Sequence, residues 1–491
     1  MTQGRNEISS AEAGYETQPA APGATMADSE LGRSTYTAAA KRLLPLLGVC
    51  YFLSYLDRTN VSVAALTMNK ALGISATAFG LGAGLFFIGY FIVEVPSNMI
   101  MHKVGARRWI ARIMISWGVV AAGQALVQGE SSFYLARILL GVMEAGFFPG
   151  AILYLTLWFP AAQRARVVGL FILAVPLSTA LGAPLGGLLL KLNGVAGLAG
   201  WQWLFIVEGV PTVLIGFMVL AWLTDRPEQA TWLTPQQRSW LSTTLAAEAR
   251  ETASRYAITT RQALVNPRVL TLSLVYFALV FGLYGLGFWI PTIIKKSLAI
   301  QDNFVVTLLS AAPYAVGVVA IIFWGRLVDH KGHPALLTAV PMLIGGLALA
   351  LTAFGTSMPW LGYAGLCVCA VGIMASFPGF WTLPSVFLSG VAAAVGIAVI
   401  NAIGNLSGFA GPYWVGWLTG LFGEAKWGLV SIGAVMVIGA LVVLRLGNAP
   451  PADHRETGSA APVTRQSTTP PGPPPPRTVL PTDTSGSPYP A

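Results

Sequence analysis

The sequence carries very little charge for its length. Charged residues make up only 10% of its 491 residues, while hydrophobic residues make up 55%. A typical soluble domain has about 25% charged residues, because its surface faces water. The apolar residues here gather in blocks of about 20 or more, each long enough to cross the hydrocarbon core of a bilayer as a helix. The composition excludes an ordinary soluble protein and predicts an all-α polytopic membrane protein.

Cysteine and histidine are also scarce, with three and four residues respectively. Cys50, Cys367 and Cys369 all fall in apolar blocks, so no disulfide framework is predicted. The Cys and His residues lack the spacing of a metal site, so we expect neither a metal nor a cofactor. An integral membrane enzyme would show a nucleophile or a metal cluster at a membrane face, and this alternative is disfavoured.

The net charge of +9 does not indicate a nucleic-acid partner. The basic residues are scattered between the apolar blocks and concentrate in alternate loops, as the positive-inside rule describes for cytoplasmic loops. These loops include the one that follows residue 101, the one around Arg164 and the one around Arg326. The pattern predicts that both termini are cytoplasmic.

About twelve membrane spans are expected, and the polar segment 224–266 divides them six and six. Their expected ranges are 43–66, 77–101, 109–128, 132–158, 166–191, 203–223, 269–294, 304–325, 335–356, 360–388, 394–420 and 426–445. The expected domains are a disordered tail at 1–36, a six-helix bundle at 37–224, a cytoplasmic linker at 225–266, a second six-helix bundle at 267–447 and a disordered proline-rich tail at 448–491. Within the linker, an amphipathic helix is expected to open at Thr234–Pro235.

Four ionisable residues lie within the first and fourth spans. Asp57 and Arg58 stand side by side in YFLSYLDRTNVSVAAL. A charge at the centre of a membrane helix costs about 2.5–3.5 kcal/mol, so it needs a partner or a water-filled cavity. Arg137 and Glu144 lie two turns apart on one face of the fourth span, and residue counting places the Asp57–Arg58 pair at a depth between them. We expect one cluster, which is either a structural ion network or a site that handles anions and protons.

Two loops suggest that the chain contains two related halves. Asn98-x3-His102-x2-Gly105 follows the second span, and Gly325-x3-Asp329-x2-Gly332 follows the eighth. Matching loops six spans apart are typical of transporters built from repeats, which bind substrate at the interface of the repeats.

Three long stretches resemble one family. They are YLDRTNVSVAAL, YLARILLGVMEAGFFPGAILYLTLWFP at 134–160 and FWTLPSVFLSGVAAAVGIAVINAIGNLSGFAGPYWVGWL at 380–418. Together they resemble the anion:cation symporter family of the major facilitator superfamily, and most of all its bacterial carboxylate permeases for tartrate, phthalate and hydroxyphenylacetate. The resemblance implies the major facilitator superfamily fold and a bacterial inner-membrane location.

The resemblance also implies roles for individual residues. The substrate-binding positions correspond to Arg58, Tyr90, Arg137, Trp381 and Asn401, and the proton-coupling positions correspond to Asp57 and Glu144. Members that transport sugar acids carry a polar side chain in the fifth span, where this chain has Val175 and Pro176. This departure argues against a sugar acid as the substrate.

The function that these observations predict is secondary active transport. We expect proton-coupled uptake of a small organic anion, such as tartrate or an aromatic carboxylate, by alternating access. A uniporter or an exporter of organic acids is the alternative within the transporter class. The expected partners are the anion, the proton and the lipid bilayer, and we expect a monomer. The sequence leaves open which anion is carried and how many protons accompany it.

Overall fold

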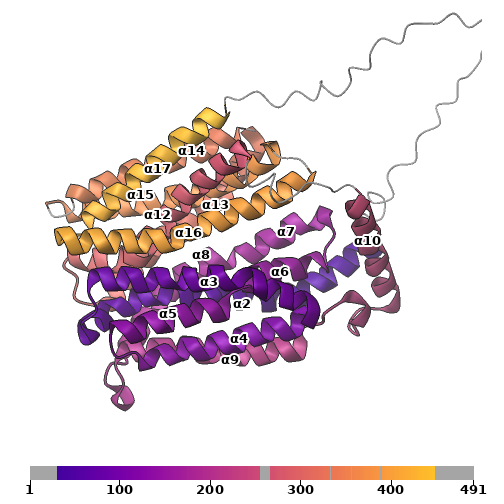
Figure 1. Cartoon of the computed structure of the whole chain (residues 1–491), viewed down its shortest axis with the longest axis horizontal. Helices are drawn as coiled ribbons and strands as arrows, with labels where there is room; N and C mark the ends of the chain where they lie inside the picture. Colours follow the sequence, from indigo (N-terminus) through magenta and orange to yellow (C-terminus); the bar gives the residue numbers. More distant parts are fainter. Residues whose placement is uncertain (1–29, 255–265, 332, 355–356, 388–389, 448–491) are drawn as a thin grey trace, which may run out of the picture. The chain divides into compact units, whose positions relative to one another are not determined.

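The structure is a computed structural model that describes residues 30–254, 266–331, 333–354, 357–387 and 390–447 (Figure 1). Every regular element in these ranges is a helix, which confirms the prediction of an all-α protein. Residues 1–29 of the expected N-terminal tail, residues 255–265 of the linker and the expected C-terminal tail from 448 onward lie outside the described residues.

The N-terminal bundle contains the first six expected spans. Its helices are α2 (Glu30–Leu72), α3 (Ala76–Val104), α4 (Ala106–Gly123), α5 (Glu130–Glu144), α6 (Phe147–Thr156), α7 (Ala161–Ile172), α8 (Ala174–Leu190) and α9 (Gly200–Trp222). The fourth span is divided into α5 and α6, and the fifth into α7 and α8. The first helix already begins at Glu30, within the segment expected to be a tail, and its residue Tyr36 is buried against the ring of Trp240.

The linker contributes α10 (Pro235–Ser254), which begins where the sequence predicts. It packs against the N-terminal bundle through Tyr36 and Trp240, whose ring centroids are 5.2 Å apart. Arg164 adds an ion pair with Glu248 on α10, with Nη2 at 3.1 Å from Oε1. The end of the helices next to α10 is called the linker end below.

The C-terminal bundle contains the last six expected spans. Its helices are α12 (Pro267–Ser297), α13 (Asn303–Lys331), α14 (Pro334–Ala350), α15 (Pro359–Phe387), α16 (Gly390–Phe422) and α17 (Lys426–Gly447). In the described part of the chain, ten helices are long and apolar enough to cross a membrane. The 17-residue α14 and the 33-residue α16 stand where the ninth and eleventh spans are expected.

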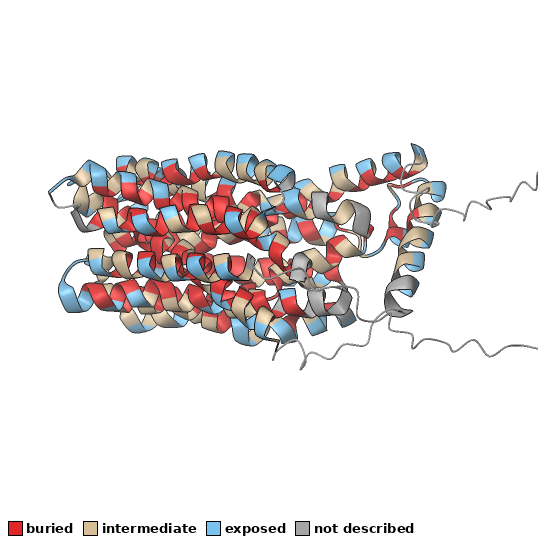
Figure 2. Cartoon of the chain, turned by 90° about the horizontal axis from the view of Figure 1, so that it is seen from above, coloured by how far each residue is buried: buried red, intermediate tan, exposed pale blue. Residues whose placement is uncertain are grey.

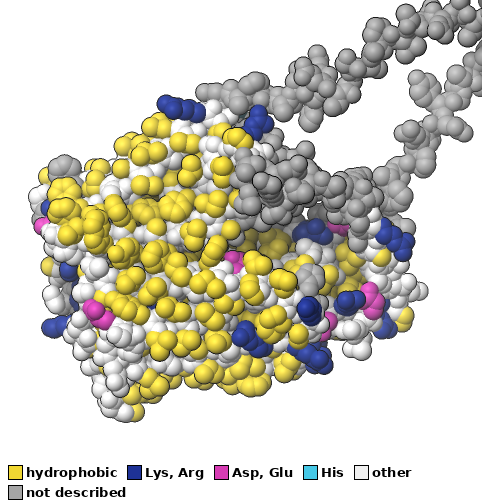
Figure 3. Space-filling model, in the orientation of Figure 1, with side chains coloured by type: hydrophobic (Ala, Val, Ile, Leu, Met, Phe, Trp, Pro, Cys, Tyr) yellow, Lys and Arg dark blue, Asp and Glu magenta, His cyan; other side chains and the backbone are white. Residues whose placement is uncertain are grey.

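Burial follows the pattern of a membrane protein. Buried residues lie between the helices, while the outward faces are exposed (Figure 2). Many exposed residues are large and apolar, including Ile92, Val95 and Val319, each with an exposed fraction of 66%. On the face drawn in Figure 3, hydrophobic side chains cover the flank of the helices. Such a surface suits lipid, which is as apolar as the side chains that face it.

The two bundles approach most closely at the end opposite the linker. A Cβ on Gly80 of α3 would lie 2.5 Å from the carbonyl oxygen of Pro412, and a Cβ on Gly416 of α16 would lie 2.6 Å from that of Ala76. We call Gly80, Gly84, Gly416 and Gly420 the glycine seam. Only residues without a side chain allow two helix backbones to approach this closely.

Polar contacts add to this closure. Lys191 at the end of α8 lies 3.5 Å from the carboxylate of Asp302, just before α13. The backbone N–H of Phe304, followed by nearby Lys191, holds the pKa of the Asp302 carboxyl below its usual value. Lys295 of α12 donates to the carbonyl oxygen of Leu66 on α2 at 3.4 Å. The end opposite the linker is therefore held by both backbone packing and polar contacts between bundles.

Candidate functional site

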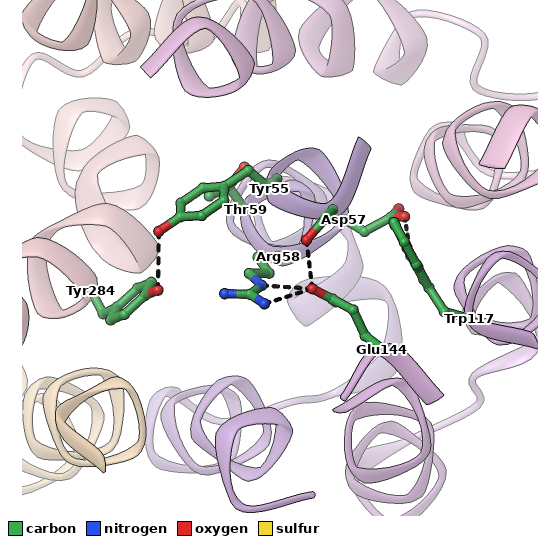
Figure 4. A network of polar contacts seen from close by, with 8 residues as sticks. Tyr55, Asp57, Arg58, Thr59, Trp117, Glu144 and Tyr284 are labelled. Atoms are coloured by element: carbon green, nitrogen blue, oxygen red, sulfur yellow. Dashed lines mark hydrogen bonds and ion pairs between the residues drawn. The ribbon is translucent and has the colours of Figure 1, made fainter. Parts of the chain in front are cut away.

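An ion pair joins α2 to α5 inside the N-terminal bundle (Figure 4). Arg58 donates from Nε to Glu144 Oε1 at 2.8 Å, and its Nη2 lies 2.7 Å from the same oxygen. The hydroxyl of Ser54 also donates to this oxygen, at 2.7 Å. Glu144 is fully buried and Arg58 is only 7% exposed. The other carboxylate oxygen, Oε2, has no hydrogen-bond partner among the described residues.

Glu144 owes its position to a break in the fourth span. It is the last residue of α5, and Gly146 follows with a φ of 89°, in the left-handed region that favours glycine. The neighbours also require glycine there, because a Cβ on Gly146 would lie 2.3 Å from the Ser97 hydroxyl oxygen. The sequence GVMEAGFFPG therefore ends one helix at Glu144 and starts the next at Phe147.

Aromatic rings surround the two buried arginines. The guanidinium carbon of Arg58 lies 5.0 Å from the ring centre of Tyr90 and 5.4 Å from those of Tyr55 and Phe86. The guanidinium carbon of Arg137 lies 5.1 Å from the centre of the Phe86 ring, so this ring contacts both arginines. Cation–π contacts of this kind stabilise a guanidinium group without using its N–H donors.

Arg137 is the least satisfied residue of the site. Its exposed fraction is 0%, yet none of its three side-chain nitrogens has a hydrogen-bond partner among the described residues. Burying such a group without an acceptor is costly, and a guanidinium group matches the geometry of a carboxylate. Arg137 can therefore offer a full set of donors to an anion.

Asp57 faces a different part of the bundle from its neighbour Arg58. Its carboxylate accepts from the indole N–H of Trp117 at 2.6 Å and from the amide of Asn60 at 3.3 Å. Asn60 also donates to Glu208 of α9, at 2.9 Å. Successive residues of a helix point about 100° apart, so Asp57 and Arg58 contact separate sets of residues.

Glu208 is a buried carboxylate that the sequence interpretation missed. It lies in the apolar run WQWLFIVEGVP of the sixth span and is only 2% exposed. The signal was available, because an ionisable residue within a membrane span indicates a functional site by default. Asn60, Ser54 and Trp117 were missed as well, since uncharged polar residues are common in membrane helices.

A cavity lies between the two bundles, next to this network. Its lining includes Tyr55, Asn60 and Glu208 from the N-terminal bundle and Tyr284, Ser310 and Tyr314 from the C-terminal bundle. Its volume is about 50 Å³, which is room for a few water molecules. Across it, the hydroxyls of Tyr55 and Tyr284 form a hydrogen bond of 3.2 Å (Figure 4). Val175 and Pro176 also line this cavity.

The remaining predicted site residues lie in the C-terminal bundle. Trp381 of α15 is 36% exposed, and its ring packs 4.9 Å from Tyr276 and 5.4 Å from Phe380. Asn401 of α16 is half-buried. The structure brings Arg58, Tyr90 and Glu144 into one cluster, with Arg137 joined through Phe86. In the ranges that the structure describes, Trp381 makes no ring contact or hydrogen bond with that cluster.

Known proteins resemble this chain over most of its length. The family model described as the Major Facilitator Superfamily matches residues 47–412. A protein of Agrobacterium vitis named as a candidate tartrate transporter is 48% identical over 414 residues, which cover 84% of this chain and 90% of that protein. A quinolone resistance transporter of Acinetobacter baumannii is 41% identical, covering 82% of this chain and 92% of that protein.

A solved structure shares the fold. It is that of a bacterial homologue of the human lysosomal transporter Spinster, in an inward-facing and unoccupied conformation. It superposes with a TM-score of 0.67 at 18% identity, and the match covers 83% of this chain and 95% of that chain. At this identity the likeness concerns the fold alone.

Proposed function

We propose that this chain takes up an organic anion, such as tartrate or an aromatic carboxylate, together with protons. The chain belongs to the major facilitator superfamily and is a multi-pass membrane transporter of a small organic substrate, not an enzyme. The observation that carries this proposal is the pair of buried arginines, Arg58 and Arg137, among aromatic rings. The relative named for tartrate supports a carboxylate substrate.

In this proposal the arginines bind the carboxylate. Arg137 has all its side-chain donors unused among the described residues, and Arg58 can exchange its Glu144 partner for a substrate carboxylate. Bidentate binding by a guanidinium group gives the geometric selectivity that a carboxylate site needs. Tyr90 flanks Arg58, and Trp381 and Asn401 would close over the substrate from the C-terminal bundle. The apolar Val175 and Pro176 in the cavity wall argue against a sugar acid.

Proton coupling follows from the competition for Arg58. Glu144 is ionised while it holds Arg58, because the pair neutralises both charges in the bundle interior. When a substrate carboxylate takes Arg58, Glu144 is left buried without its counter-charge and binds a proton instead. Substrate and proton then favour each other's binding, and this reciprocal effect is the coupling. Asp57 is the second candidate for a proton-coupling residue.

We propose that the linker end faces the cytoplasm, with both termini on that side, in the bacterial inner membrane. Basic residues concentrate in the loops of the linker end, which supports this orientation. Closure at the opposite end then means that the site is shut off from the exterior, and alternating access would open the glycine seam. The cavity lies within a single chain, so we propose that the transporter acts as a monomer.

Export is the second candidate function. The relative named as a quinolone resistance transporter favours it. The ion pair and the cavity serve either direction, because coupling by itself does not fix the direction of flow. An exporter of this kind would release its substrate on the side opposite the linker, in exchange for protons.

A two-stage experiment tests the proposal. Purified protein is first screened by thermal shift against tartrate, phthalate, hydroxyphenylacetate, nicotinate and sugar acids. The stabilising anion is then supplied to proteoliposomes with an acidic exterior. Accumulation above the external concentration, abolished by a proton ionophore, is the expected result. If no carboxylate is bound or accumulated while a quinolone is expelled from acidic-exterior cells, the uptake proposal is wrong.

A further inference from the structure

Glu208 is an ionisable residue of the membrane interior that the Arg58–Glu144 pair does not involve. Its side chain lines the cavity between the bundles and is 2% exposed. Oε2 accepts a hydrogen bond of 2.9 Å from Asn60, and Oε1 has no hydrogen-bond partner among the described residues. A buried carboxylate with an unpaired oxygen is costly unless a proton or a ligand compensates it.

The neighbours of Glu208 provide no positive charge. In the described part of the chain, no Lys or Arg forms an ion pair with it. Of the helices packed against α9, α8 has no ionisable side chain along its whole length, and the arginines of α4 are exposed near the linker end. From α2 it faces Asp57 through Asn60, and the other titratable groups of the cavity are Tyr55, Tyr284 and Tyr314.

Asn60 ties the two carboxylates together. A single amide nitrogen carries two hydrogens, and Nδ2 of Asn60 lies 2.9 Å from Glu208 Oε2 and 3.3 Å from Asp57 Oδ1. The two carboxylates therefore share one donor group with no cation between them. Two like charges this close in a membrane interior cannot both persist, and one proton between them removes the repulsion.

The hydrogen bonds decide which carboxylate takes that proton. Both oxygens of Asp57 accept donors, one from Trp117 at 2.6 Å and one from Asn60. Glu208 has the Asn60 donor alone, and its residue lines the cavity. Donors stabilise an ionised carboxylate, so Asp57 is the better anion and Glu208 the better acid. The cavity also gives Glu208 a route for proton exchange with water.

We propose that Glu208 is a second proton-binding site, open to the cavity and separate from the Arg58–Glu144 pair, with Asn60 and Asp57 as its positioning residues. The proton binds Oε1, where no protein donor competes. In transport this site rests on the proposed function, since it would carry a proton in addition to the one bound at Glu144. A dianionic substrate could then cross with both of its charges compensated.

The first test needs no substrate. The full-length protein is placed in lipid nanodiscs, and infrared difference spectra are recorded between weakly acidic and alkaline pH. These spectra detect buried carboxyl groups through the C=O stretch of the protonated form. Glu208→Gln is expected to remove one component of that band, which Glu144→Gln retains. Glu424→Gln serves as the matched control, since Glu424 is exposed and does not line the cavity. A Glu208→Gln spectrum that superposes on the wild type would overturn the proposal.

A second variant covers the case in which Glu208→Gln does not fold. Asn60→Ala removes the shared donor and leaves Glu208 in place, so the Glu208 component should shift in frequency. An unshifted component would count against the site. For transport, tartrate is the probe, and the proton-to-tartrate ratio in proteoliposomes should fall about twofold in Glu208→Gln, whereas an unchanged ratio contradicts the proposal. A wild-type protein that does not transport tartrate would refute the tartrate proposal alone, because the infrared result still decides the proton site.

Discussion

The two bundles use their buried polar residues in opposite ways. In the described part of the C-terminal bundle, each buried polar residue is a serine or a threonine, and each hydroxyl donates to the backbone carbonyl oxygen three or four residues earlier in the chain. These residues are Ser273, Thr307, Ser310, Thr338, Thr352, Ser376, Ser407 and Thr419. In the N-terminal bundle, Ser54, Arg58 and Asn60 instead reach side chains of other helices.

This difference indicates a division of labour. A helix whose polar groups are satisfied within itself can move against its neighbours without breaking a hydrogen bond. Helices joined by buried charges must keep their relative positions, because separating a buried ion pair costs about 3–5 kcal/mol. We therefore assign the ionic chemistry to the N-terminal bundle. We regard the C-terminal bundle as a less polar wall that moves against it once contacts such as Tyr55–Tyr284 and Lys295–Leu66 break.

The largest effect is expected from changing the shape of one cation in the N-terminal bundle. Arg58→Lys keeps the charge but loses the planar fork that binds a carboxylate. Uptake in proteoliposomes should fall by about 100-fold or more in kcat/KM, which corresponds to about 2.7 kcal/mol. Arg445→Lys, at an exposed position of the C-terminal bundle, is the matched control. Wild-type kinetics in folded Arg58→Lys would exclude Arg58 as the carboxylate anchor.

The next effect separates proton coupling from substrate binding. Glu144→Gln mimics a permanently protonated residue, so counterflow across proteoliposome membranes should stay within about threefold of the wild type. Accumulation driven by a pH gradient should fall by about tenfold or more, because the proton can no longer bind and leave. The decisive comparison is counterflow against pH-driven uptake in the same preparation. If both persist at wild-type rates, Glu144 is not an essential proton carrier, and the carboxylate pair Asp57–Glu208 becomes the leading candidate. Glu424→Gln checks that removing an exposed carboxylate does nothing.

A smaller effect is expected from the aromatic wall of the C-terminal bundle. Trp381→Ala should raise the KM by about tenfold with little change in kcat, because one stacking face is worth about 0.5–1.5 kcal/mol. Trp360→Ala, on the same helix but 65% exposed, should leave both constants unchanged. Equal effects of the two substitutions would mean that Trp381 packs against its neighbours and does not contact substrate.

The smallest effect concerns the hydrogen bond that crosses the cavity. Tyr284→Phe removes the hydrogen-bond partner of Tyr55. This should destabilise the conformation with a closed glycine seam by about 0.5–1.5 kcal/mol. Maleimide labelling of a Thr77→Cys background, which reports opening near the glycine seam, should accelerate about threefold. Tyr363→Phe is the control, because its hydroxyl donates within the C-terminal bundle, to Leu309. Equal labelling rates in the two variants would show that the cross-cavity bond does not hold the bundles together.

The architecture could be predicted well from the sequence because the membrane restricts the choices. Each span must satisfy its own backbone in lipid, so apolar length alone locates the helices. Helix breaks were harder to predict. The fourth span was expected over 132–158 without a break, but its helix is interrupted after Glu144, where Gly146 adopts a left-handed conformation, and resumes at Phe147. Glycine is a poor helix former, but propensity alone does not locate the break, because tertiary contacts such as those of Ser97 with Gly146 decide it.

The depth of the site residues in the membrane could be predicted from the sequence, but the direction in which each side chain points could not. Counting residues placed Arg58 between Arg137 and Glu144, and the structure brings Arg58 and Glu144 into contact. The same counting grouped Asp57 with them, but it contacts Trp117 and Asn60 instead. Depth follows from the helical rise, whereas the direction of a side chain depends on the rotation of the helix, which packing against neighbours sets.

The glycine seam has a consequence for how freely this sequence can vary. At Gly80 and Gly416 even one methyl group would lie within 2.6 Å of a backbone oxygen of the facing helix. Backbone atoms cannot rotate away as a side chain can, so an alanine there acts as a wedge. A complete mutational scan should therefore find these positions nearly as intolerant as the arginines, although they touch no charge. Positions that carry no chemistry at all can in this way limit the evolution of the protein as strictly as its binding residues do.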